Sequence, residues 1–368
     1  MRKFIKYSFL FSSILFALLL AFCKTIPNLN PYEQSFAGIL GLATPLLAII
    51  NVIFLITWLI LRKYFILCIP LLALIFSWKV YSVTIGGHLF SSQHFEKTPN
   101  SFSLLSYNVR LLDLYNWSGQ KNTRELMIQF FAKQNPTILC LQEFYTGNDS
   151  VGKNNIRDIA NACHYEYWAN CIINENKRGK WGCVIFSHLP IVKSQNHDID
   201  VFGNNLLQQV DVLFQKETIS IFNIHLKSNK FSAEEADLIV NGEQVNLSEQ
   251  TTSKTKLIYQ KLEKNAINRG LEAALVSKII TSSKNKKIVC GDLNDIPSSY
   301  TYFKMRNTLK DAFLDKGVGI GSTYITKFPV LRIDYIFHSK ELYTLGFQKI
   351  KIQYSDHYPL LVHFGIDH

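Results

Sequence analysis

The chain has 368 residues, of which 48% are hydrophobic and 18% charged, and its formal net charge at pH 7 is +11. The charge is uneven, because residues 1–98 contain eight Lys or Arg, two Glu and no Asp, which leaves 31 basic and 26 acidic residues for 99–368. An excess of 31 over 26 is too small to identify the second part by itself as a nucleic-acid-binding domain, and the first part has the composition of a membrane segment.

Three apolar segments precede residue 98, and we expect each to form a transmembrane helix. Tyr7–Cys23 is uncharged, and Gln34–Leu61 is uncharged after a polar start. The third runs from Tyr64 to about Ile85 and is interrupted only by Lys79, whose long side chain can reach an interface. A spanning helix needs about 20 apolar residues. We therefore predict an all-α membrane anchor over residues 1–98.

The short loops between these segments indicate how the anchor is oriented. Basic residues lie at the N-terminus and at Arg62–Lys63, whereas the first loop carries only Lys24 and Glu33. Because basic loops stay on the cytoplasmic side, we expect the chain after the third segment to lie outside the cytoplasmic membrane. A cleaved signal peptide is the alternative for the first segment, since Ala21-Phe22-Cys23 weakly resembles a cleavage site, and cleavage would leave the later chain on the same side.

The spacing of the seven cysteines does not match a recognisable disulfide framework. Five of them fall in residues 99–368, with no CxxC pair among them. Cys140 and Cys290 end apolar runs and are expected to be small buried hydrophobic residues. A disulfide among Cys163, Cys171 and Cys183 stays open if the domain is extracytoplasmic.

We predict a second domain over residues 99–368, preceded by a linker over 86–100. Its predicted helices are Thr123–Gln134 and about 255–282, and a polar stretch over 229–253 is expected to be a loop. Its predicted strands are Phe102–Asn108, Thr137–Leu141, Cys183–Ser187, Leu206–Phe214, Thr218–His225, Lys287–Cys290, Ile333–His338 and Leu360–Phe364. This mixture of short strands and amphipathic helices favours an α+β or α/β sandwich.

Polar residues follow the apolar strands at their ends, where sheets gather reactive groups. Each of these residues alone has an ordinary explanation, as a turn residue, a solvated carboxylate or a hydrogen-bonded histidine. Together, four carboxylates, two amides and two imidazoles supply ligands for a hard cation and groups for acid–base chemistry. The set is Asn108, Glu143, His225, Asp292, Asn294, Asp334, Asp356 and His357.

The motifs around these residues, taken in order, resemble the endonuclease/exonuclease/phosphatase superfamily, which includes DNase I-like nucleases, sphingomyelinases and inositol-polyphosphate 5-phosphatases. The motifs are Ser-Tyr-Asn-Val (106–109), Leu-Gln-Glu (141–143), the strand over 182–190, Asn-Ile-His-Leu-Lys-Ser (223–228), Gly-Asp-Leu-Asn-Asp-x-Pro (291–297), Arg-Ile-Asp-Tyr-Ile-Phe (332–337) and Ser-Asp-His-Tyr-Pro-Leu (355–360). The resemblance covers about Ser101 to Phe364. It implies an α+β fold, the four-layer αββα sandwich.

The resemblance also implies a divalent cation and a nucleophilic water. Mg²⁺, for which Mn²⁺ can substitute, would be bound by Glu143, Asn108 and Asp356, with waters and a substrate oxygen completing its shell. Asp292 would orient or deprotonate the attacking water, and Asn294 would hold a phosphate oxygen. In-line attack by that water would cleave a P–O bond.

Other positions would contact the phosphate or support the groups that do. By the same resemblance, His225 and His357 would donate to non-bridging oxygens, and Asp356 would orient and charge-stabilise His357. Asp334 would support this histidine pair or the leaving group. Lys227 and Arg269 would touch phosphate. The alternatives are a solvated side chain for the lysine and a helix-surface salt bridge for the arginine.

The predicted function is metal-dependent hydrolysis of phosphodiesters by a nuclease-like enzyme acting on nucleic acid. The alternatives are a lipid-directed phosphodiesterase acting on phospholipid, an inositol-phosphate phosphatase, and a catalytically silent binding module. A transport function is disfavoured, since the apolar segments lack charged residues apart from Lys79. The chain has no P-loop, HExxH, GxSxG or zinc-spaced Cys/His motif. The expected partners are the substrate and the lipid bilayer, and no protein partner is predicted.

Overall fold

The computed structural model describes residues 2–88, 98–148, 153–199, 205–228, 249–326 and 331–366. The chain forms two compact units. The first comprises Met1–Ile85, Gly242–Gly270 and Asp295–Lys304, and the second comprises Gly86–Asn241, Leu271–Asn294 and Met305–His368.

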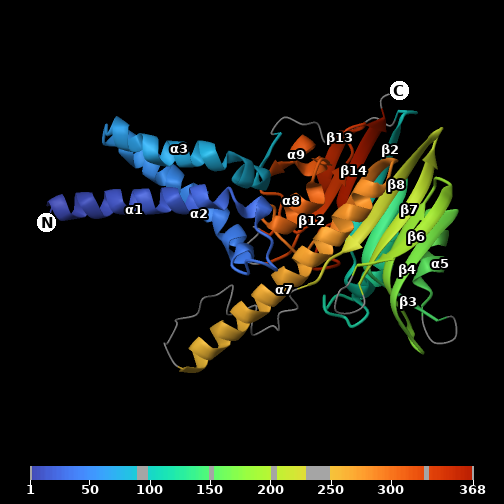
Figure 1. Ribbon diagram of the computed structural model, residues 1–368. Coiled ribbons are helices and arrows are strands. Elements are labelled where there is room, and N and C mark those ends of the chain that lie inside the picture. Colours follow the sequence, from blue (N-terminus) through green and yellow to red (C-terminus); the bar gives the residue numbers. More distant parts are fainter. Residues whose placement is uncertain are drawn as a thin grey trace. The chain divides into compact units, whose positions relative to one another are not determined.

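Three apolar helices make up most of the first unit. They are α1 (Arg2–Cys23), α2 (Ala37–Ile60) and α3 (Tyr64–Tyr81), seen in blue and cyan in Figure 1. All three are long and apolar enough to cross a membrane, as the sequence predicts. The third is shorter than expected, because a 3₁₀ turn over Ser82–Thr84 follows Tyr81.

Polar side chains between these helices satisfy one another inside an apolar bundle. The Asn51 amide donates to the Phe16 carbonyl at 3.0 Å, and the Ser77 hydroxyl donates to the Leu20 carbonyl at 2.7 Å. Large apolar side chains point outward, including Phe65, which is 96% exposed. This pattern, with hydrogen-bonded polar groups inside and apolar groups outside, is the one that a lipid environment favours.

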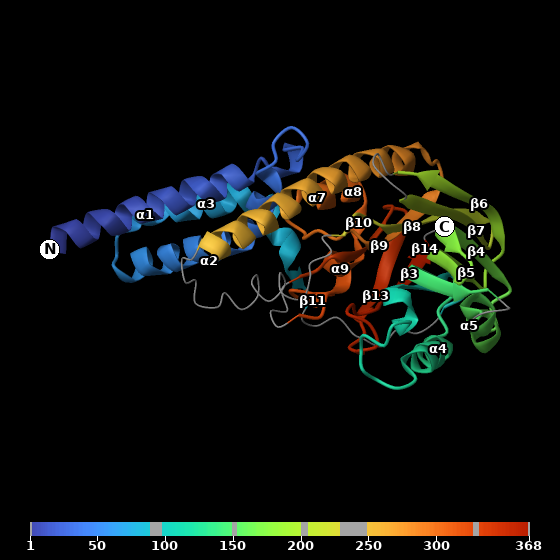
Figure 2. The ribbon, with the colours of Figure 1, turned by 90° about the horizontal axis from the view of Figure 1, so that it is seen from below.

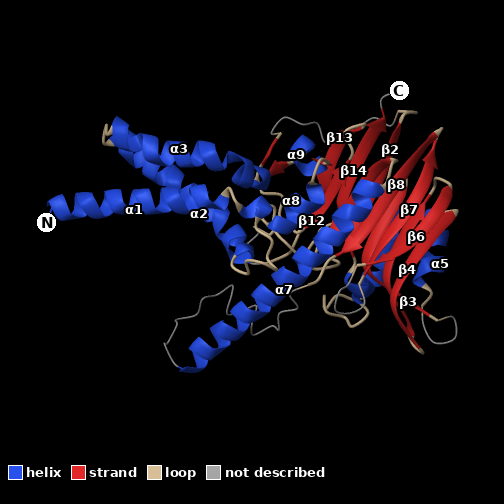
Figure 3. Ribbon diagram, viewed as in Figure 1, coloured by secondary structure: helices blue, strands red, loops and turns tan. Residues whose placement is uncertain are grey.

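Two six-stranded sheets form the centre of the second unit, shown as red arrows in Figure 3. Sheet 1 has the order β13 (Leu342–Lys349), β14 (Leu360–Ile366), β2 (Ser101–Asn108), β3 (Ile138–Gly147), β5 (Gly179–Ser187) and β4 (Tyr167–Asn176). Sheet 2 has the order β10 (Lys310–Asp311), β12 (Asp334–His338), β9 (Lys286–Asp292), β8 (Glu217–His225), β7 (Leu206–Phe214) and β6 (Ile191–Asp198). The pairs β2–β3 and β8–β9 are parallel, and the other pairs within the two sheets are antiparallel.

Helices cover the outer faces of both sheets. On sheet 1, α4 (Thr123–Gln134) and α5 (Asn155–Cys163) bury apolar side chains such as Phe131 and Ile159 against the sheet. On sheet 2, the part of α7 (Glu249–Ser282) that begins at Leu271 belongs to the same unit. Figures 1 and 2 both show this part beside the strands. The expected four-layer αββα sandwich is therefore confirmed.

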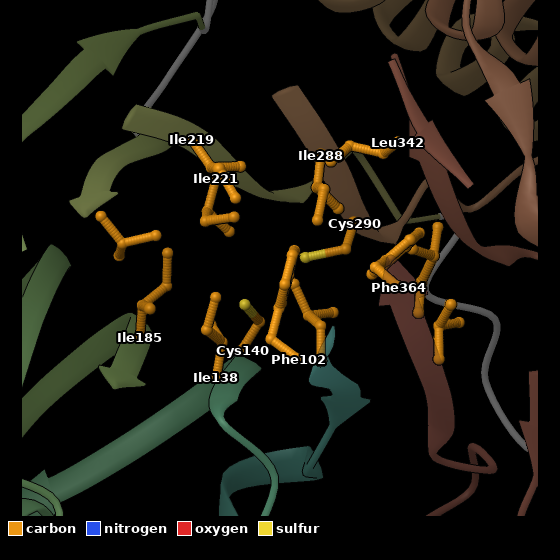
Figure 4. Close-up of a cluster of buried hydrophobic side chains, with 14 of the residues drawn as sticks. Phe102, Ile138, Cys140, Ile185, Ile219, Ile221, Ile288, Cys290, Leu342 and Phe364 are labelled. Atoms are coloured by element: carbon orange, nitrogen blue, oxygen red, sulfur yellow. The ribbon is translucent and has the colours of Figure 1, made fainter. Parts of the chain in front are cut away.

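An apolar layer fills the space between the two sheets. Figure 4 shows Ile138, Cys140 and Ile185 of sheet 1 facing Ile221 and Cys290 of sheet 2, and all of these side chains are buried. Successive residues of a strand point to opposite faces, which is why Leu139 and Leu141 pack instead against the helices outside sheet 1. Burial of such side chains, at about 1.5–3 kcal/mol each, is the main force that holds the sandwich together.

The structure corrects several predictions in this unit. Strands β4, β6 and β13 and helix α5 were not predicted. Strand β6 is mostly exposed and α5 has only nine residues, so each buries few apolar side chains. The predicted linker includes a short strand, since β1 (Gly86–Gly87) pairs with β11 (Val318–Gly319). Residues 249–253 of the predicted loop are helical, and residues 89–97 and 229–248 lie outside the described residues. All seven cysteines are free.

Gly291 permits close contact between β8 and β9 just before the candidate site. Its φ is +131°, and a Cβ there would lie 2.0 Å from the Ile224 carbonyl oxygen. We expect Gly291→Ala to reduce the free energy of unfolding by about 2–5 kcal/mol, from backbone strain and overpacking together. Thermal unfolding measures it. Gly87→Ala is the control, because a Cβ at Gly87 meets no described atom within 4 Å, and equal losses in the two variants would contradict this account.

Candidate active site

The polar strand ends meet at one end of the layer between the two sheets. In sheet 1, Asn108 ends β2, beside Gln142 of the parallel strand β3. In sheet 2, His225 ends β8 directly beside Asp292 of β9, and Asp334 lies opposite Asp292 on β12. The two parallel pairs therefore carry their polar ends to a common place, as the sequence predicts for strand ends in open sheets.

Glu143 is presented by a β-bulge. The pairing of β3 with β5 shifts from Leu141 opposite Val184 to Phe144 opposite Gly182, so β3 contains one extra residue there. Glu143 has a φ of +46°, in the left-handed region. Its side chain remains 34% exposed. The bulge thus turns a carboxylate that regular alternation would bury against α4 and α5 towards solvent at the site.

His225, Asp292 and the two asparagines form one connected group. His225 Nε2 lies 3.3 Å from Glu143 Oε1 and 3.7 Å from Asp292 Oδ2. The amide of Asn108 donates to Asp292 Oδ2 at 3.1 Å, and the backbone N–H of Asn294 donates to Asp292 Oδ1 at 2.7 Å. The Asn294 amide also lies 3.3 Å from His225 Nε2. Asp292, which is 1% exposed, therefore accepts a hydrogen bond on each of its two carboxylate oxygens.

A second imidazole approaches Asp292 from the other side. His357 Nδ1 lies 2.8 Å from Asp334 Oδ2, and its Nε2 lies 3.7 Å from Asp292 Oδ2. Asp292, Asp334 and His357 each offer a ligand atom within 4.8 Å of the others, a grouping that could hold a metal ion. The ring of Tyr324 packs edge-on against the His357 imidazole, at 5.1 Å between centroids.

Asp356 lies at the rim of the site. Its Oδ1 is 4.0 Å from His357 Nε2, whereas its Oδ2 pairs with Arg110 Nε at 3.4 Å. The expectation that Asp356 orients His357 is therefore wrong, because Asp334 makes the short contact to that ring. The Arg110 guanidinium also stacks over the Trp117 ring at 4.6 Å. Sequence reasoning missed Arg110, although its position two residues after Asn108 was a usable signal.

Burial and mutual charge perturb the acid–base behaviour of these groups. Burial and the charge of Asp334 raise the pKa of Asp292 to about 6, against the opposing imidazoles. Burial alone would lower the pKa of His357, but the charges of Asp334 and Asp292 outweigh it and raise that pKa to about 10. Burial alone would raise the pKa of Glu143, yet the hydrogen bond and charge of His225 lower it to about 2.

The histidine that contacts Glu143 is perturbed in the same sense as His357. Burial alone would lower the pKa of His225, and the hydrogen bond and charge of Glu143 outweigh it and raise that pKa. At neutral pH the site therefore contains an ionised Glu143, a cationic His357, and an Asp292 carboxyl group that is mostly ionised but keeps a small protonated fraction.

The two remaining candidates lie in different surroundings. Lys227 is exposed, and its backbone N–H donates to Glu272 Oε2 at 2.8 Å. Arg269 belongs to the first compact unit, where its Nε pairs with Asp295 Oδ2 at 3.4 Å. The salt bridge that the sequence left as an alternative for Arg269 is therefore present, although Arg269 is buried rather than on the helix surface.

Comparison with protein families gives two matches. The Endonuclease/Exonuclease/phosphatase family matches residues 105–357, which contain every site residue discussed above. A domain of unknown function (DUF8431) matches residues 2–84, the stretch that holds the three apolar helices. No curated protein matches the sequence.

Comparison with solved structures gives similar folds at low sequence identity. An endonuclease/exonuclease/phosphatase from Beutenbergia cavernae has a TM-score of 0.52 and 13% identity, covering 73% of this chain and 72% of its own. One from Bacteroides vulgatus has a TM-score of 0.52 and 14% identity, covering 74% and 100%. The human Nocturnin catalytic domain, solved with a bound sulfate anion, has a TM-score of 0.50 and 16% identity, covering 74% and 97%. At these identities the likeness shows the fold alone.

Proposed function

This chain belongs to the endonuclease/exonuclease/phosphatase family, and we propose that it hydrolyses phosphodiester bonds with the help of a divalent cation. Members of this family are in general hydrolases of phosphoester bonds. The observation that carries the proposal is the meeting of Glu143, His225, Asp292 and His357 at one end of the layer between the sheets. A single site there combines an ionised Glu143, a buried Asp292 whose pKa is raised to about 6, and two imidazoles whose pKa values are raised by the neighbouring carboxylates.

The donor set suits a small hard cation such as Mg²⁺. Glu143 is ionised and reaches solvent, and the Asn108 amide N–H hydrogen-bonds to it. The Asn108 Oδ1, which accepts from the Arg110 backbone N–H at 3.1 Å, is the amide oxygen that could serve as a ligand. Asp356 is a further carboxylate at the rim. Mg²⁺ prefers a few such oxygen ligands together with waters. We therefore assign the cation to Glu143, Asn108 and Asp356, where it would neutralise charge that develops on phosphoryl oxygens.

We assign the buried Asp292, Asp334 and His357 to proton handling rather than to the cation. Asp334 Oδ2 is paired with His357 Nδ1 at 2.8 Å. Both oxygens of Asp292 accept N–H bonds from Asn108 and Asn294, so these carboxylates already have partners inside the protein. Asp292, with its pKa near 6, is suited to orient and deprotonate the attacking water. Asp334 fixes the orientation of the His357 ring through Nδ1, leaving Nε2–H to donate to a non-bridging phosphate oxygen.

Two further groups complete the phosphate site in this proposal. His225 faces the same space as Glu143, whose hydrogen bond and charge raise the pKa of His225, so an Nε2–H there can donate to a second phosphate oxygen once substrate displaces that contact. The Asn294 amide, beside His225, is placed to hold a third. A tetrahedral anion is bound by the human Nocturnin catalytic domain, whose structure contains sulfate, and this supports a phosphate site in the shared fold.

The preferred substrate class in this proposal is nucleic acid, with phospholipid as the alternative. The three apolar helices serve as an anchor over residues 1–98, and the catalytic domain over 99–368 lies outside the cytoplasmic membrane. The basic Arg62–Lys63 turn between two of the helices supports this orientation. Protease digestion of intact spheroplasts is expected to remove the domain, and protection there with digestion in inverted vesicles would contradict it.

Removal of divalent cations is expected to abolish hydrolysis. Full-length protein in detergent is incubated with a chromogenic phosphate bis-ester, plasmid DNA, RNA and phospholipid vesicles, each with EDTA, Mg²⁺ or Mn²⁺. We expect turnover only with the cation, and faster turnover of the bis-ester than of the matching mono-ester. Cation-independent turnover, or no turnover of any substrate, would refute the proposed function.

A further inference from the structure

A chain of buried amide and hydroxyl groups crosses the apolar layer between the two sheets, next to the candidate site. The Gln142 amide of β3 donates to Asn223 Oδ1 of β8 at 2.7 Å and to Ser106 Oγ of β2 at 3.1 Å. The Asn223 amide donates in turn to the Leu141 carbonyl at 3.2 Å and to Gln208 Oε1 of β7 at 3.2 Å. We call Ser106, Gln142, Asn223 and Gln208 the inter-sheet clasp, because these bonds join sheet 1 to sheet 2.

The clasp is enclosed by protein on all sides. Gln142, Asn223 and Gln208 are 0% exposed and Ser106 is 3% exposed. The next layer inward is apolar, since Asn223 lies beside Cys290 in the register of β8 and β9, and Cys290 belongs to the core cluster of Figure 4. Polar groups at this depth are fixed strongly, since no water competes for their bonds.

Three clasp residues lie one or two positions before a site residue on the same strand. Ser106 lies two positions before Asn108, and Asn223 lies two positions before His225, so each pair shares one face of its strand. Gln142 lies next to Glu143, at the point where the bulge interrupts the β3–β5 register. The clasp therefore holds the last regular residues of β2, β3 and β8 before the site begins.

The stability of the fold does not account for this arrangement. The Gln142 Oε1 atom is buried and has no hydrogen-bond partner among the described residues, which costs free energy relative to an apolar side chain of the same size. Apolar contacts hold two sheets together but are not directional, so they tolerate small shifts of one sheet over the other. Hydrogen bonds across the layer do not tolerate such shifts.

We propose that the inter-sheet clasp is a positioning device, which fixes Glu143 on sheet 1 relative to His225 and Asp292 on sheet 2. The inference rests on the proposed function, in which the two sheets contribute different parts of one reaction site. A site divided between two sheets requires their spacing to be fixed within a fraction of an ångström. The inter-sheet clasp fixes this spacing at the buried position nearest to the candidate site.

The test replaces the clasp by apolar side chains of similar volume in the full-length protein, as Gln142→Met with Asn223→Leu. We expect a thermal midpoint close to or slightly below that of the parent, because the unpartnered Gln142 Oε1 is removed while Gln208 Oε1 loses the Asn223 donor. We expect kcat to fall about 10- to 100-fold with little change in KM, and the affinity for Mn²⁺, measured by calorimetry without substrate, to fall by a similar factor. Amide hydrogen exchange of peptides that contain Glu143 and His225 is expected to accelerate about tenfold.

Ser220→Ala is the matched control. Ser220 is another buried polar residue of β8, and its hydroxyl donates to Asp211 Oδ1 at 2.7 Å within sheet 2. The Ser220→Ala variant should have a lower thermal midpoint but the same kcat and Mn²⁺ affinity as the parent. The milder variant Ser106→Ala removes one hydrogen bond of the clasp. It should lower kcat and Mn²⁺ affinity, and accelerate local hydrogen exchange, by smaller factors than the double variant.

The possible results distinguish failure of the clasp proposal from failure of the proposed function. Parental kcat, Mn²⁺ affinity and local exchange in the double variant would overturn the proposal. Loss of the fold in the double variant and in Ser106→Ala together would assign the clasp to stability and overturn it as well. If the parent itself neither binds Mn²⁺ nor hydrolyses an ester, the proposed function fails, and the exchange measurement still tests the clasp.

Discussion

Replacing Glu143 by Gln is expected to lower kcat/KM by about 10³-fold and to weaken cation affinity at least tenfold. The substitution keeps the shape and the bulge but removes the ionised carboxylate that we assign to the cation. A bound cation contributes several kcal/mol of charge stabilisation in the transition state, and 1.36 kcal/mol corresponds to tenfold in rate. Steady-state kinetics with the bis-ester and calorimetric titration with Mn²⁺ measure the two effects.

Glu125→Gln is the control for this experiment. Glu125 is a partly exposed carboxylate on α4 that pairs with Lys153 at 2.6 Å, so its loss should leave kinetics and cation affinity unchanged. If Glu143→Gln retained the parental Mn²⁺ affinity, the assignment of Glu143 as the main cation ligand would be wrong. The buried group of Asp292, Asp334 and His357 would then be the remaining place for the cation.

Replacing Arg332 by Met is expected to reduce the free energy of unfolding by about 3–5 kcal/mol, because it leaves a buried carboxylate without its counter-charge. Arg332 Nη1 lies 2.8 Å from Asp311 Oδ2, and these side chains are 2% and 0% exposed. The guanidinium also stacks on the rings of Phe313, at 4.4 Å, and Tyr335, at 4.7 Å. In a unit of this size the thermal midpoint should fall by roughly 10 °C.

A second substitution tests whether the uncompensated charge is the cause. Asp311 also caps α9 (Ala312–Lys316) by accepting from the Phe313 N–H at 3.0 Å, and Asn at position 311 can keep that bond. The double variant Arg332→Met with Asp311→Asn should therefore be more stable than Arg332→Met alone. As a control, Lys180→Met breaks an exposed pair with Glu175 and should cost at most about 1 kcal/mol. A double variant less stable than Arg332→Met would refute the charge explanation.

The sequence predicted the fold class and most of its regular elements. Helix α4 and strand β7 were predicted with the bounds they have in the structure. In α4 the buried residues Met127, Phe130 and Phe131 lie on one helical face, and β7 is a largely buried, apolar-rich strand. Strand β6 was not predicted, and most of its side chains are exposed. A strand with little buried surface leaves a weak pattern in the sequence.

The sequence by itself determined which residue types stand at the strand ends, and their order along the chain. Asn108, Glu143, His225, Asp292 and His357 were identified in this way, because polar residues that end apolar runs are unusual enough to be noticed. The three apolar helices follow equally directly, since hydrophobic length and charge are local properties.

Only the tertiary structure decided which other residues each of these side chains contacts. The bulge that exposes Glu143, the pairing of Asp356 with Arg110, and the burial of Asp292 between two imidazoles depend on contacts between strands far apart in the chain. The same holds for the bond between Gln142 and Asn223, which are 81 positions apart. Periodicity reports the face to which a side chain points, whereas partners and pKa values arise from the register and spacing of two sheets, which no local pattern encodes.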